Sequence, residues 1–329
     1  MSFKIPQFKA KPPDRDIFSG LPRFLLDEVT DQIDIGVGSY GLVKFGRYST
    51  DGKQSRDVVV KIPRDITGYE KEFAKEAKLL NSVKGHPNIV SFEAVSVSPF
   101  AIMTEYLKFS FEPFDDPKSV NSLADFLSHV HSQYDFNGFE QVVPVIAKDV
   151  AVGLKYLHDN DIVHSDLKPA NILVSNQHYA HMHGDELEFM WNNQPVVCKI
   201  ADFGEGRSAP EVLLPELRPQ QATLEQLKAI DTWAYGMVLF VLINPALHYP
   251  YQEELLKERS SNPFKDIMDC LREIIRRSRR PLYTEKYEVQ QATVWNNVLN
   301  LQEAFTEFHI KKRTCSMRDA ITTDRKSVV

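Results

Sequence analysis

The change of pattern along the chain constrains its fold more than any other feature. In residues 32–107, Gly-rich turns separate short β-branched runs such as residues 58–60, which indicates strands. One patch in this part, residues 69–83, has helical periodicity instead. Its apolar face consists of Phe73, Ala77 and Leu80. The front of the chain is therefore predicted to be a sheet with one helix.

Helical patterns dominate beyond residue 107. A long amphipathic stripe recurs at helical spacing, formed by Val143, Ile146, Val150, Leu154 and Leu157. Residues 233–243 are apolar on nearly every side, which is typical of a helix buried in a core. A strand-rich front and a helix-rich back predict an α+β protein with two lobes.

Composition narrows the possible functions. The 329 residues are 43% hydrophobic and 26% charged, as in an ordinary globular protein. The net charge of -6 argues against nucleic-acid binding, which usually needs a basic excess. The three cysteines lack CxxC spacing, which excludes a cysteine zinc site and a disulfide framework and favours a reducing compartment. Residues 237–243, the most apolar stretch, reach about a third of a bilayer span. We therefore expect a cytoplasmic protein with no membrane partner.

A glycine-rich segment follows the first strand-like run. Residues 35–43 read Ile-Gly-Val-Gly-Ser-Tyr-Gly-Leu-Val, the pattern GxGxxGxV. Such glycines let the backbone approach phosphate oxygens and point amides at them, although turn glycines are common. No βαβ helix follows, which argues against a dinucleotide fold. Lys61 comes at the end of a Val-rich run, where a return strand places it near the loop; a solvated edge charge is the alternative.

A polar segment follows the amphipathic stripe. Residues 164–171 read His-Ser-Asp-Leu-Lys-Pro-Ala-Asn. Phosphoryl transfer needs an acceptor for a hydroxyl proton, a cation and a metal-binding amide, which Asp166, Lys168 and Asn171 provide. A polar turn is the alternative, because Asp, Pro and Asn are turn residues. Asp202 lies in an Asp-Phe-Gly sequence directly after a strand-like run. A carboxylate at the end of a strand suits Mg²⁺, although a lone Asp-Phe-Gly is also a common turn.

In their order and spacing these motifs resemble the signature set of the eukaryotic protein kinases. The resemblance covers about residues 32–320 and also includes Ala209-Pro210-Glu211, Asp231-x-Trp233-x-x-Gly236 and Arg313, which resembles the arginine that anchors Glu211. It implies a two-lobed protein kinase-like fold of the α+β class over residues 31–322. The small β-rich N-lobe would comprise residues 31–107 and the large, mainly helical C-lobe residues 108–322. Residues 1–30 are expected to form an extension that lies on the surface or stays mobile, and residues 323–329 a tail.

The resemblance also implies the site residues. Thr104 looks like the gatekeeper, and residues 105–107 like the hinge that meets adenine. The expected ATP-binding set is Ile35, Gly36, Gly38, Gly41, Val43, Val59, Lys61, Glu76, Thr104, Glu105 and Leu107. Asp166 resembles the catalytic base and Lys168 the γ-phosphate ligand. Asn171 and Asp202 look like the Mg²⁺ ligands.

Lys168 also bears on the acceptor. The sequence Asp-Leu-Lys-Pro-x-Asn resembles serine/threonine kinases, whereas tyrosine kinases usually have alanine and arginine there. The expected function is transfer of the γ-phosphate of Mg-ATP to Ser/Thr hydroxyls of a protein that the sequence does not identify. The rival is an ATP-binding pseudokinase scaffold or a product with a deleted activation segment. A small-molecule kinase of related fold ranks last, because such proteins generally lack these motifs together.

Two departures from the family concern the activation segment. Ser165 stands where the family usually has an arginine that pairs with an activation-loop phosphate, so switching by that phosphate is not expected. Only four residues, 205–208, separate Gly204 from Ala209, where the family has a much longer segment. The platform for a peptide substrate would then be missing. An alternative alignment uses Pro215-Glu216 as the motif and lengthens the segment by five residues.

Two further departures lie elsewhere. Val59 stands where the family often has alanine above the adenine, and we expect it to tighten that ceiling without blocking the nucleotide. The stretch between Asn171 and Asp202 is longer than usual. Its extra residues, 176–193, contain His178, His181 and His183 beside Asp185 and Glu186. A metal site fits the histidine spacing, but we expect a polar surface hairpin.

Two weaker signals complete the sequence. A basic patch could contact acidic partners or nucleic acid, although a solvated helix face is the expected explanation; it consists of Arg272, Arg276, Arg277, Arg279 and Arg280. The final residues, Ser327-Val328-Val329, are similar to a PDZ-domain ligand, a pattern that arises often by chance.

Overall fold

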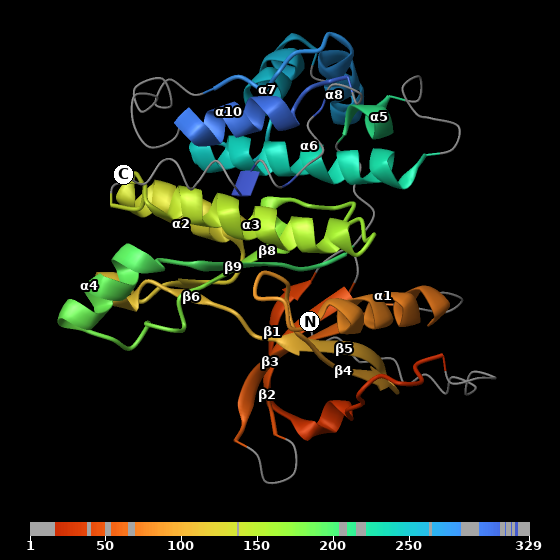
Figure 1. Ribbon diagram of the computed structural model, residues 1–329, viewed down its shortest axis with the longest axis vertical. Helices are drawn as coiled ribbons and strands as arrows, with labels where there is room; N and C mark the ends of the chain where they lie inside the picture. The colour runs from red at the N-terminus through yellow and green to blue at the C-terminus, as the bar shows by residue number, and fades with distance from the viewer. Residues whose placement is uncertain are drawn as a thin grey trace. The chain divides into compact units, whose positions relative to one another are not determined.

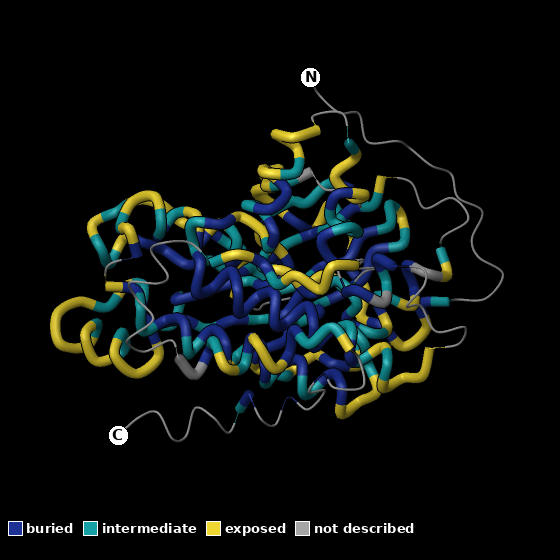
Figure 2. The backbone as a smooth tube through the Cα atoms, turned by 90° about the horizontal axis from the view of Figure 1, so that it is seen from above, coloured by how far each residue is buried: buried dark blue, intermediate teal, exposed yellow. Residues whose placement is uncertain are grey.

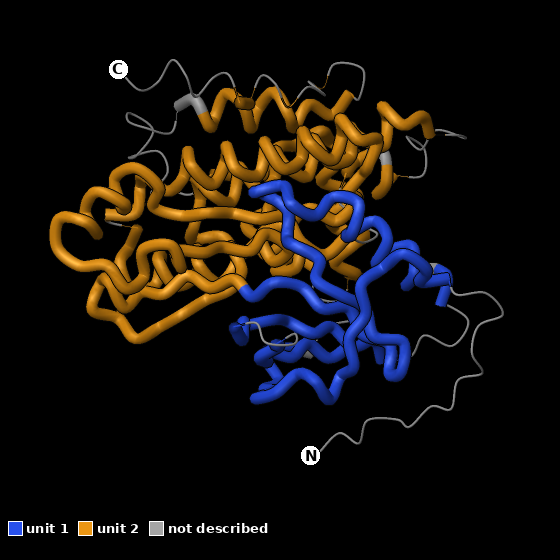
Figure 3. The backbone as a smooth tube through the Cα atoms, turned by 60° about the horizontal axis from the view of Figure 1, so that its bottom comes forward, with its two compact units in different colours: residues 1–106 blue, residues 107–329 orange. Residues whose placement is uncertain are grey.

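The computed structural model forms two compact units, residues 1–106 and residues 107–329 (Figure 3). It describes residues 17–37, 41–49, 54–64, 70–136, 138–203, 209–214, 222–262, 265–283 and 296–309, together with residues 313, 317, 320 and 321. Buried and exposed stretches alternate along the chain in both units (Figure 2).

The first unit is built on a five-stranded antiparallel sheet in the order β1-β2-β3-β5-β4 (Figure 1). Its strands are β1 (Val29–Val37), β2 (Gly41–Tyr48), β3 (Arg56–Pro63), β4 (Phe92–Val97) and β5 (Phe100–Glu105). Side chains alternate between the two faces of a strand. Val58 and Val60 of β3 are accordingly buried in an apolar cluster with Met103, whereas Val59 and Lys61 lie on the other face and are half-buried.

Helix α1 (Glu70–Val83) follows β3, and the helix predicted for this part of the chain is confirmed. Its predicted apolar face, Phe73, Ala77 and Leu80, is buried. The Phe73 ring lies 5.7 Å from that of Phe100 on β5 and 6.0 Å from that of Phe18. These aromatic contacts join the helix, the sheet and the segment before β1.

Residues 17–30 correct the expectation of a surface extension. Phe18 and Phe24 are buried, with 1% and 4% of their surface exposed. Phe24 N donates to Val95 O (3.3 Å), and Val95 N donates to Pro22 O (2.9 Å), so this segment pairs with the free edge of β4. The segment then forms a short 3-10 helix, Leu26–Glu28, and enters β1. It belongs to the first unit because its aromatic side chains fill that core; residues 1–16 lie outside the described residues.

The second unit is mainly helical. Its described helices are α2 (Leu123–Tyr134), α3 (Val142–Asp159), α4 (Gly184–Asn193), α5 (Pro210–Leu213), α6 (Leu224–Ile243), α7 (Gln252–Ser261), α8 (Ile267–Arg276) and α10 (Asn296–Phe305). Two short antiparallel pairs join β6 (Phe109–Ser110) to β7 (Ser119–Val120), and β8 (Ile172–Ser175) to β9 (Val197–Ile200). The stripe predicted for residues 143–157 is buried along α3, which confirms the prediction.

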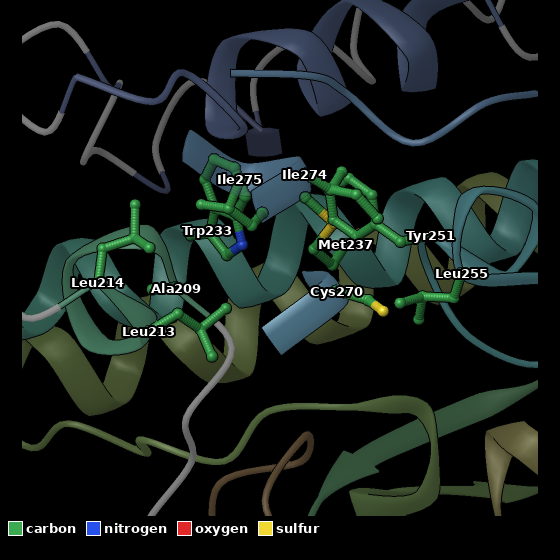
Figure 4. Packing of buried hydrophobic residues seen from close by; sticks show 10 residues of the cluster. All are labelled: Ala209, Leu213, Leu214, Trp233, Met237, Tyr251, Leu255, Cys270, Ile274 and Ile275. Atoms are coloured by element: carbon green, nitrogen blue, oxygen red, sulfur yellow. The ribbon is translucent and has the colours of Figure 1, made fainter. Parts of the chain in front are cut away.

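Helix α6 is the core helix of this unit. Thr223 and Gln226 form a capping box at its start, and residues 231–243 are all buried. Among the described helices it alone is long and apolar enough to cross a membrane, but 78% of its apolar window is buried inside the protein. Figure 4 shows Trp233 and Met237 of α6 among residues of α5, α7 and α8. Helix α6 therefore serves as an internal packing element.

The insertion at residues 176–193 is wrongly predicted as a polar hairpin. It contains α4 (Figure 1), and two residues of its first part, Asn176 and Tyr179, are buried. Asn176 is buried and exchanges hydrogen bonds of 2.8 Å with the backbone N and O of Ser110. Trp191 of α4 packs on Phe114 and Phe139, with ring centroids 4.8 and 5.4 Å apart. No group that could hold a metal ion occurs among the described residues, so the histidine spacing finds no support there.

Candidate active site

The register of the first sheet gathers several predicted nucleotide residues on one face. Val43 of β2 lies opposite Lys61 of β3, and Val59 lies opposite Thr104 of β5. Directly opposed residues share a face of a sheet, as do residues two apart on one strand. Val43, Val59, Lys61 and Thr104 therefore share the face opposite the apolar cluster. Gly36 of β1 pairs with Val43.

Lys61 and Glu76 form the predicted ion pair. Lys61 Nζ lies 3.8 Å from Glu76 Oε1 on α1, and the two side chains are 22% and 28% exposed. The pair joins the sheet to the helix on the face that holds Val59. Its length and partial exposure indicate a modest contribution to stability.

Gly41 occupies a position that other residues cannot take. Its φ is +151°, and an added Cβ would lie 2.0 Å from Ile62 O on the neighbouring strand. At Gly36 the nearest atom to such a Cβ is Val43 Cβ at 3.9 Å, an ordinary contact. Close backbone approach thus explains one glycine of the motif. Gly38 lies outside the described residues, and Ile35 is an exposed residue of β1.

The predicted hinge residues have local partners of their own. Glu105 N donates to Ser91 O (3.0 Å), and Glu105 Oε1 accepts from Ser91 N (2.6 Å). These bonds tie the end of β5 to the segment before β4. Leu107 begins the second unit, is buried, and accepts a hydrogen bond at its carbonyl from Asn121.

In the second unit, Asp231 of α6 anchors the loop that contains Asp166. Its Oδ2 accepts from His164 N (2.8 Å) and from His158 Nε2 (2.9 Å), while Oδ1 accepts from Ser165 N (2.8 Å). Asp231 is fully buried. Ser165 has a φ of +68°, a left-handed conformation that these two bonds to backbone N–H groups support. Sequence reasoning missed His158, because it lies on the buried side of an apolar helix.

Three predicted residues of this loop contact one another. Lys168 Nζ lies 2.6 Å from Asp166 Oδ2. Asn171 Nδ2 donates to Asp166 O (2.8 Å) and to Asp166 Oδ2 (3.0 Å). These contacts fix the orientation of the Asp166 carboxylate, and Lys168, which is half exposed, places a positive charge beside it.

The β8–β9 pair brings Asp202 next to this group. Asn171 immediately precedes β8, and Ala201 N donates to Asn171 O (2.9 Å) beyond the end of the ladder. Asp202 is exposed and has a left-handed φ of +56°. Because Asn171 Nδ2 points at Asp166, its Oδ1 is the end available to a cation. A carboxylate and an amide oxygen are hard ligands that fit Mg²⁺.

His164 links the loop that contains Asp166 to the segment that contains Asp202. Its Nδ1 accepts from Asp166 N (3.2 Å), and its Nε2 donates to Ala201 O (3.0 Å). The Phe203 ring lies 4.9 Å from the imidazole. Burial lowers the pKa of His164, which favours the neutral imidazole that this pattern of one acceptor and one donor requires.

The end of the predicted activation segment packs on α6. Ala209 and Leu213 join the cluster around Trp233. Arg313 is buried, donates from Nη1 to Ala229 O (2.9 Å) and lies 4.9 Å from the Trp233 ring. Residues 204–208 and 215–221, the Glu211 side chain and residues 322–329 lie outside the described residues. The short segment, the pairing of Glu211 with Arg313 and the proposed PDZ ligand therefore stay predictions.

The arginine-rich stretch at residues 272–280 is partly neutralised. Arg272 pairs with Asp269 (2.7 Å), Arg277 with Glu258 (3.7 Å) and Arg280 with Glu303 (3.4 Å). These pairs favour the predicted solvated helix face over a surface that attracts acidic partners.

Comparison with known proteins agrees with this geometry. The family model described as protein kinase domain matches residues 29–322. Cyclin-dependent kinase E-1 of Arabidopsis thaliana is 29% identical over 265 residues, covering 73% of this chain and 49% of the relative. Serine/threonine-protein kinase STY46 of Arabidopsis thaliana is 30% identical over 243 residues, 67% of this chain and 34% of the relative. Ephrin type-B receptor 5 of Gallus gallus is 27% identical over 231 residues, 64% of this chain and 20% of the relative.

The chain thus spans half or less of the length of these relatives. The family match covers most of the chain and includes both units. A five-stranded antiparallel sheet with one helix in the first unit and a helical second unit correspond to the N-lobe and C-lobe of the kinase fold. The chain belongs to the protein kinase family.

Proposed function

We propose that this protein kinase domain transfers the γ-phosphate of ATP to serine or threonine hydroxyls of proteins, with Mg²⁺ as the metal ion. The observation that carries the proposal is the contact group of Asp166, Lys168 and Asn171 beside Asp202, anchored by the buried Asp231. A carboxylate, a cation and hard metal ligands are the groups that phosphoryl transfer requires.

Asp166 accepts the hydrogen bond of the acceptor hydroxyl and receives its proton as the reaction proceeds. The hydroxyl oxygen bonds to the γ-phosphorus while the bond to the β–γ bridging oxygen breaks, and ADP leaves. Lys168 neutralises charge on the migrating group. Asn171 and Asp202 would hold Mg²⁺, which would supply further neutralisation of the phosphate charge when bound. Catalysis would come mainly from positioning and electrostatics, because the protein forms no covalent bond.

The first unit supplies the nucleotide contacts of the proposal. Lys61 would contact the α- and β-phosphates while Glu76 orients its ammonium group. Backbone amides near Gly36 and Gly41 would cover the phosphates, and the shared face of Val43, Val59 and Thr104 would receive the adenine. Val59 is half-buried on this face, so its methyl groups would form part of the adenine ceiling.

The choice of serine or threonine as acceptor is supported by Lys168 within the Asp-Leu-Lys-Pro-x-Asn sequence. One relative is named as a serine/threonine-protein kinase, whereas ephrin receptors also match, so the names of the relatives alone do not decide the acceptor. Phosphoamino-acid analysis of the product decides it directly. Phosphotyrosine as the main product would overturn this part of the proposal and leave the phosphotransferase assignment intact.

The test of the main proposal is transfer of labelled γ-phosphate from Mg-ATP to the protein itself and to a basic Ser/Thr-containing substrate. Asp166→Asn is the control, because asparagine keeps the size and the hydrogen bonds of the site but cannot take the proton. We expect turnover to fall at least about 100-fold in the variant. ATP binding, measured by calorimetry, should be unchanged. Equal turnover in both proteins would overturn the assignment of Asp166.

A second candidate is an ATP-binding pseudokinase scaffold. The observation that favours it is the sequence between Gly204 and Ala209, only four residues long. The second candidate predicts ATP binding by the wild-type protein without transfer to any substrate. Transfer that disappears with Asp166→Asn would exclude it.

A further inference from the structure

Strand β9 leads to Asp202 and packs against helix α3 (Figure 1). Its other neighbour is β8, and the register places Val174 of β8 opposite Cys198 of β9. Val174 N donates to Asn121 O (2.9 Å), so this amide points away from β9. In an antiparallel pair, two opposed residues either exchange hydrogen bonds or both turn their amides outward. Cys198 N therefore also points outward, away from β8.

The outward amide of Cys198 meets a carboxylate from α3. Asp149 Oδ2 accepts a hydrogen bond from Cys198 N at 2.8 Å. Asp149 is half-buried, and Cys198 is only 1% exposed. Removing the acceptor would break this bond in a place that water enters poorly, where the loss of a hydrogen bond is most costly. Asp149 thus ties the outer edge of β9 to α3.

The segment after β9 is held at several points, and the conformation of Asp202 depends on them. Ala201 N donates to Asn171 O (2.9 Å), and Ala201 O accepts from His164 Nε2 (3.0 Å). Asp202 has a left-handed φ of +56°, which is unfavourable for a residue other than glycine. Such a conformation persists only where the surrounding structure imposes it. The position of β9 therefore helps to fix the Asp202 backbone and its distance from Asn171.

We propose that Asp149 is a positioning residue for the metal site of the proposed function. By bonding to Cys198 N it holds β9 on α3 and keeps Asp202, four residues further on, at the distance from Asn171 that a shared Mg²⁺ requires. This inference rests on the proposed function, in which Asn171 and Asp202 are the metal ligands. The effect of Asp149 is transmitted through the backbone of β9.

Variants of similar size separate the hydrogen bond from the charge. Asp149→Asn keeps a side-chain oxygen that can accept from Cys198 N, whereas Asp149→Leu has no acceptor. Both remove the negative charge, so a difference between them reports the hydrogen bond. Asp149→Ala repeats the loss of the acceptor without adding an apolar side chain. Asp159→Leu is the control on the same helix, where the exposed carboxylate pairs with Lys155.

The first measurement is the binding of Mn–ATP to the full chain, followed by the proton relaxation of water, which changes when the complex joins a slowly tumbling protein. The wild type, Asp149→Asn and Asp159→Leu should bind Mn–ATP with similar affinity. In Asp149→Leu and Asp149→Ala we expect the affinity to fall about five-fold, because binding must then restore the position of β9 without one net hydrogen bond. Binding of metal-free ATP, measured by calorimetry in EDTA, should be the same in all five proteins.

The second measurement does not depend on the nucleotide. Cys198 and Cys270 are both buried, and Cys270 lies in the cluster around Trp233 (Figure 4). With a thiol reagent and mass spectrometry, the ratio of Cys198 to Cys270 labelling rates should be about five-fold higher in Asp149→Leu than in Asp149→Asn. Burial raises the pKa of the Cys198 thiol and the charge of Asp149 raises it further, so the uncharged Asn variant is the reference.

The outcomes separate this inference from the proposed function. Equal affinity for Mn–ATP in Asp149→Leu and the wild type would overturn the inference, and so would an equal labelling ratio in Asp149→Leu and Asp149→Asn. Weaker binding of metal-free ATP by Asp149→Leu would also overturn it, because general damage to the nucleotide site would explain the loss. If the wild type itself does not bind Mn–ATP, the metal assignment of the proposed function is wrong, and this inference falls with it.

Discussion

Each unit has its own group of predicted site residues, and the two groups are held in place by different kinds of interaction. In the first unit, Lys61 and Glu76 meet in an ion pair of 3.8 Å whose side chains are partly exposed. In the second unit, the fully buried Asp231 accepts three hydrogen bonds of 2.8–2.9 Å that fix the loop before Asp166. Water screens the first interaction, while burial strengthens the second and makes its loss costly.

This difference indicates which of the two groups of residues can change position at the lower cost in stability. The loop of the second unit cannot move without leaving buried donors unpaired. The position of α1 relative to β3 depends on packing around Phe73 and on a modest ion pair, so a change there costs less. We therefore expect substitutions at the two places to separate stability from activity.

Asp231→Asn should have the largest effect. Asparagine has only one acceptor oxygen. Its NH₂ group would face an N–H group that now donates a hydrogen bond to the Asp231 carboxylate. We expect a loss of about 3 kcal/mol in the free energy of unfolding, measured in urea. Asp161→Asn is the matched control, because Asp161 is exposed and pairs with Lys228 at the surface. If the two variants unfold at the same urea concentration, the anchoring of the loop by Asp231 is wrong.

Gly41→Ala tests whether backbone approach, rather than the ion pair, fixes the sheet of the first unit. The new Cβ would lie 2.0 Å from Ile62 O, so β2 and β3 must move apart. We expect a loss of about 2 kcal/mol together with weaker ATP binding. Gly36→Ala is the control, since its Cβ would meet only Val43 Cβ at 3.9 Å. Thermal unfolding of both variants decides, and equal melting temperatures would contradict the close approach.

The stability of the second unit should depend on pH through His164. Burial lowers its native pKa from the usual 6.5, so below pH 6.5 the unfolded chain binds a proton that the native state does not. Stability is therefore lost as the pH falls from 6.5 to the lowered native value. His164→Gln removes this dependence, so the loss of stability between pH 6.5 and pH 5.5 should be smaller in the variant, by at most about 1 kcal/mol.

His86 in the first unit provides the comparison. Its pKa is also lowered by burial, but the side chain is more exposed than that of His164. His86→Gln should change the pH dependence in the same direction by a smaller amount. Urea unfolding at several pH values measures both variants, and a larger effect of His86→Gln would reverse the comparison.

Glu76→Gln should have the smallest effect on folding. The lost ion pair is partly exposed, so the free energy of unfolding should change by less than about 1 kcal/mol. Phosphate transfer should nevertheless fall sharply under the proposed function, because Lys61 loses the group that orients it. A loss of stability as large as that of Asp231→Asn would show that the two groups of residues, one in each unit, are held in the same way.

Much of the fold could be predicted because it depends on periodicity. The buried faces of α1 and α3 follow from apolar residues at helical spacing. The burial of α6 follows from residues 233–243 being apolar on nearly every side, and these predictions are confirmed. The site residues were predicted from short motifs, and the structure brings Asp166, Lys168 and Asn171 into contact. Their chemical roles stay predictions until the transfer assay is made.

Other features could not be predicted, because they depend on partners distant in sequence. Phe18 and Phe24 stand in a Pro-rich segment without periodicity, and only their contacts with the sheet show that they belong to a core. The sequence does contain a signal for helix α4, because Leu187, Met190 and Trp191 recur at helical spacing, but this apolar face spans little more than one turn.

The sequence by itself determined the family, the order of the motifs and the faces of the long helices, because these depend on residues close together in the chain. Only the tertiary structure decided that Asp231 accepts bonds from His158, His164 and Ser165. It also decided that Gly41 meets a neighbouring strand. Hydrogen bonds and close contacts between distant segments arise only when packing brings those segments together.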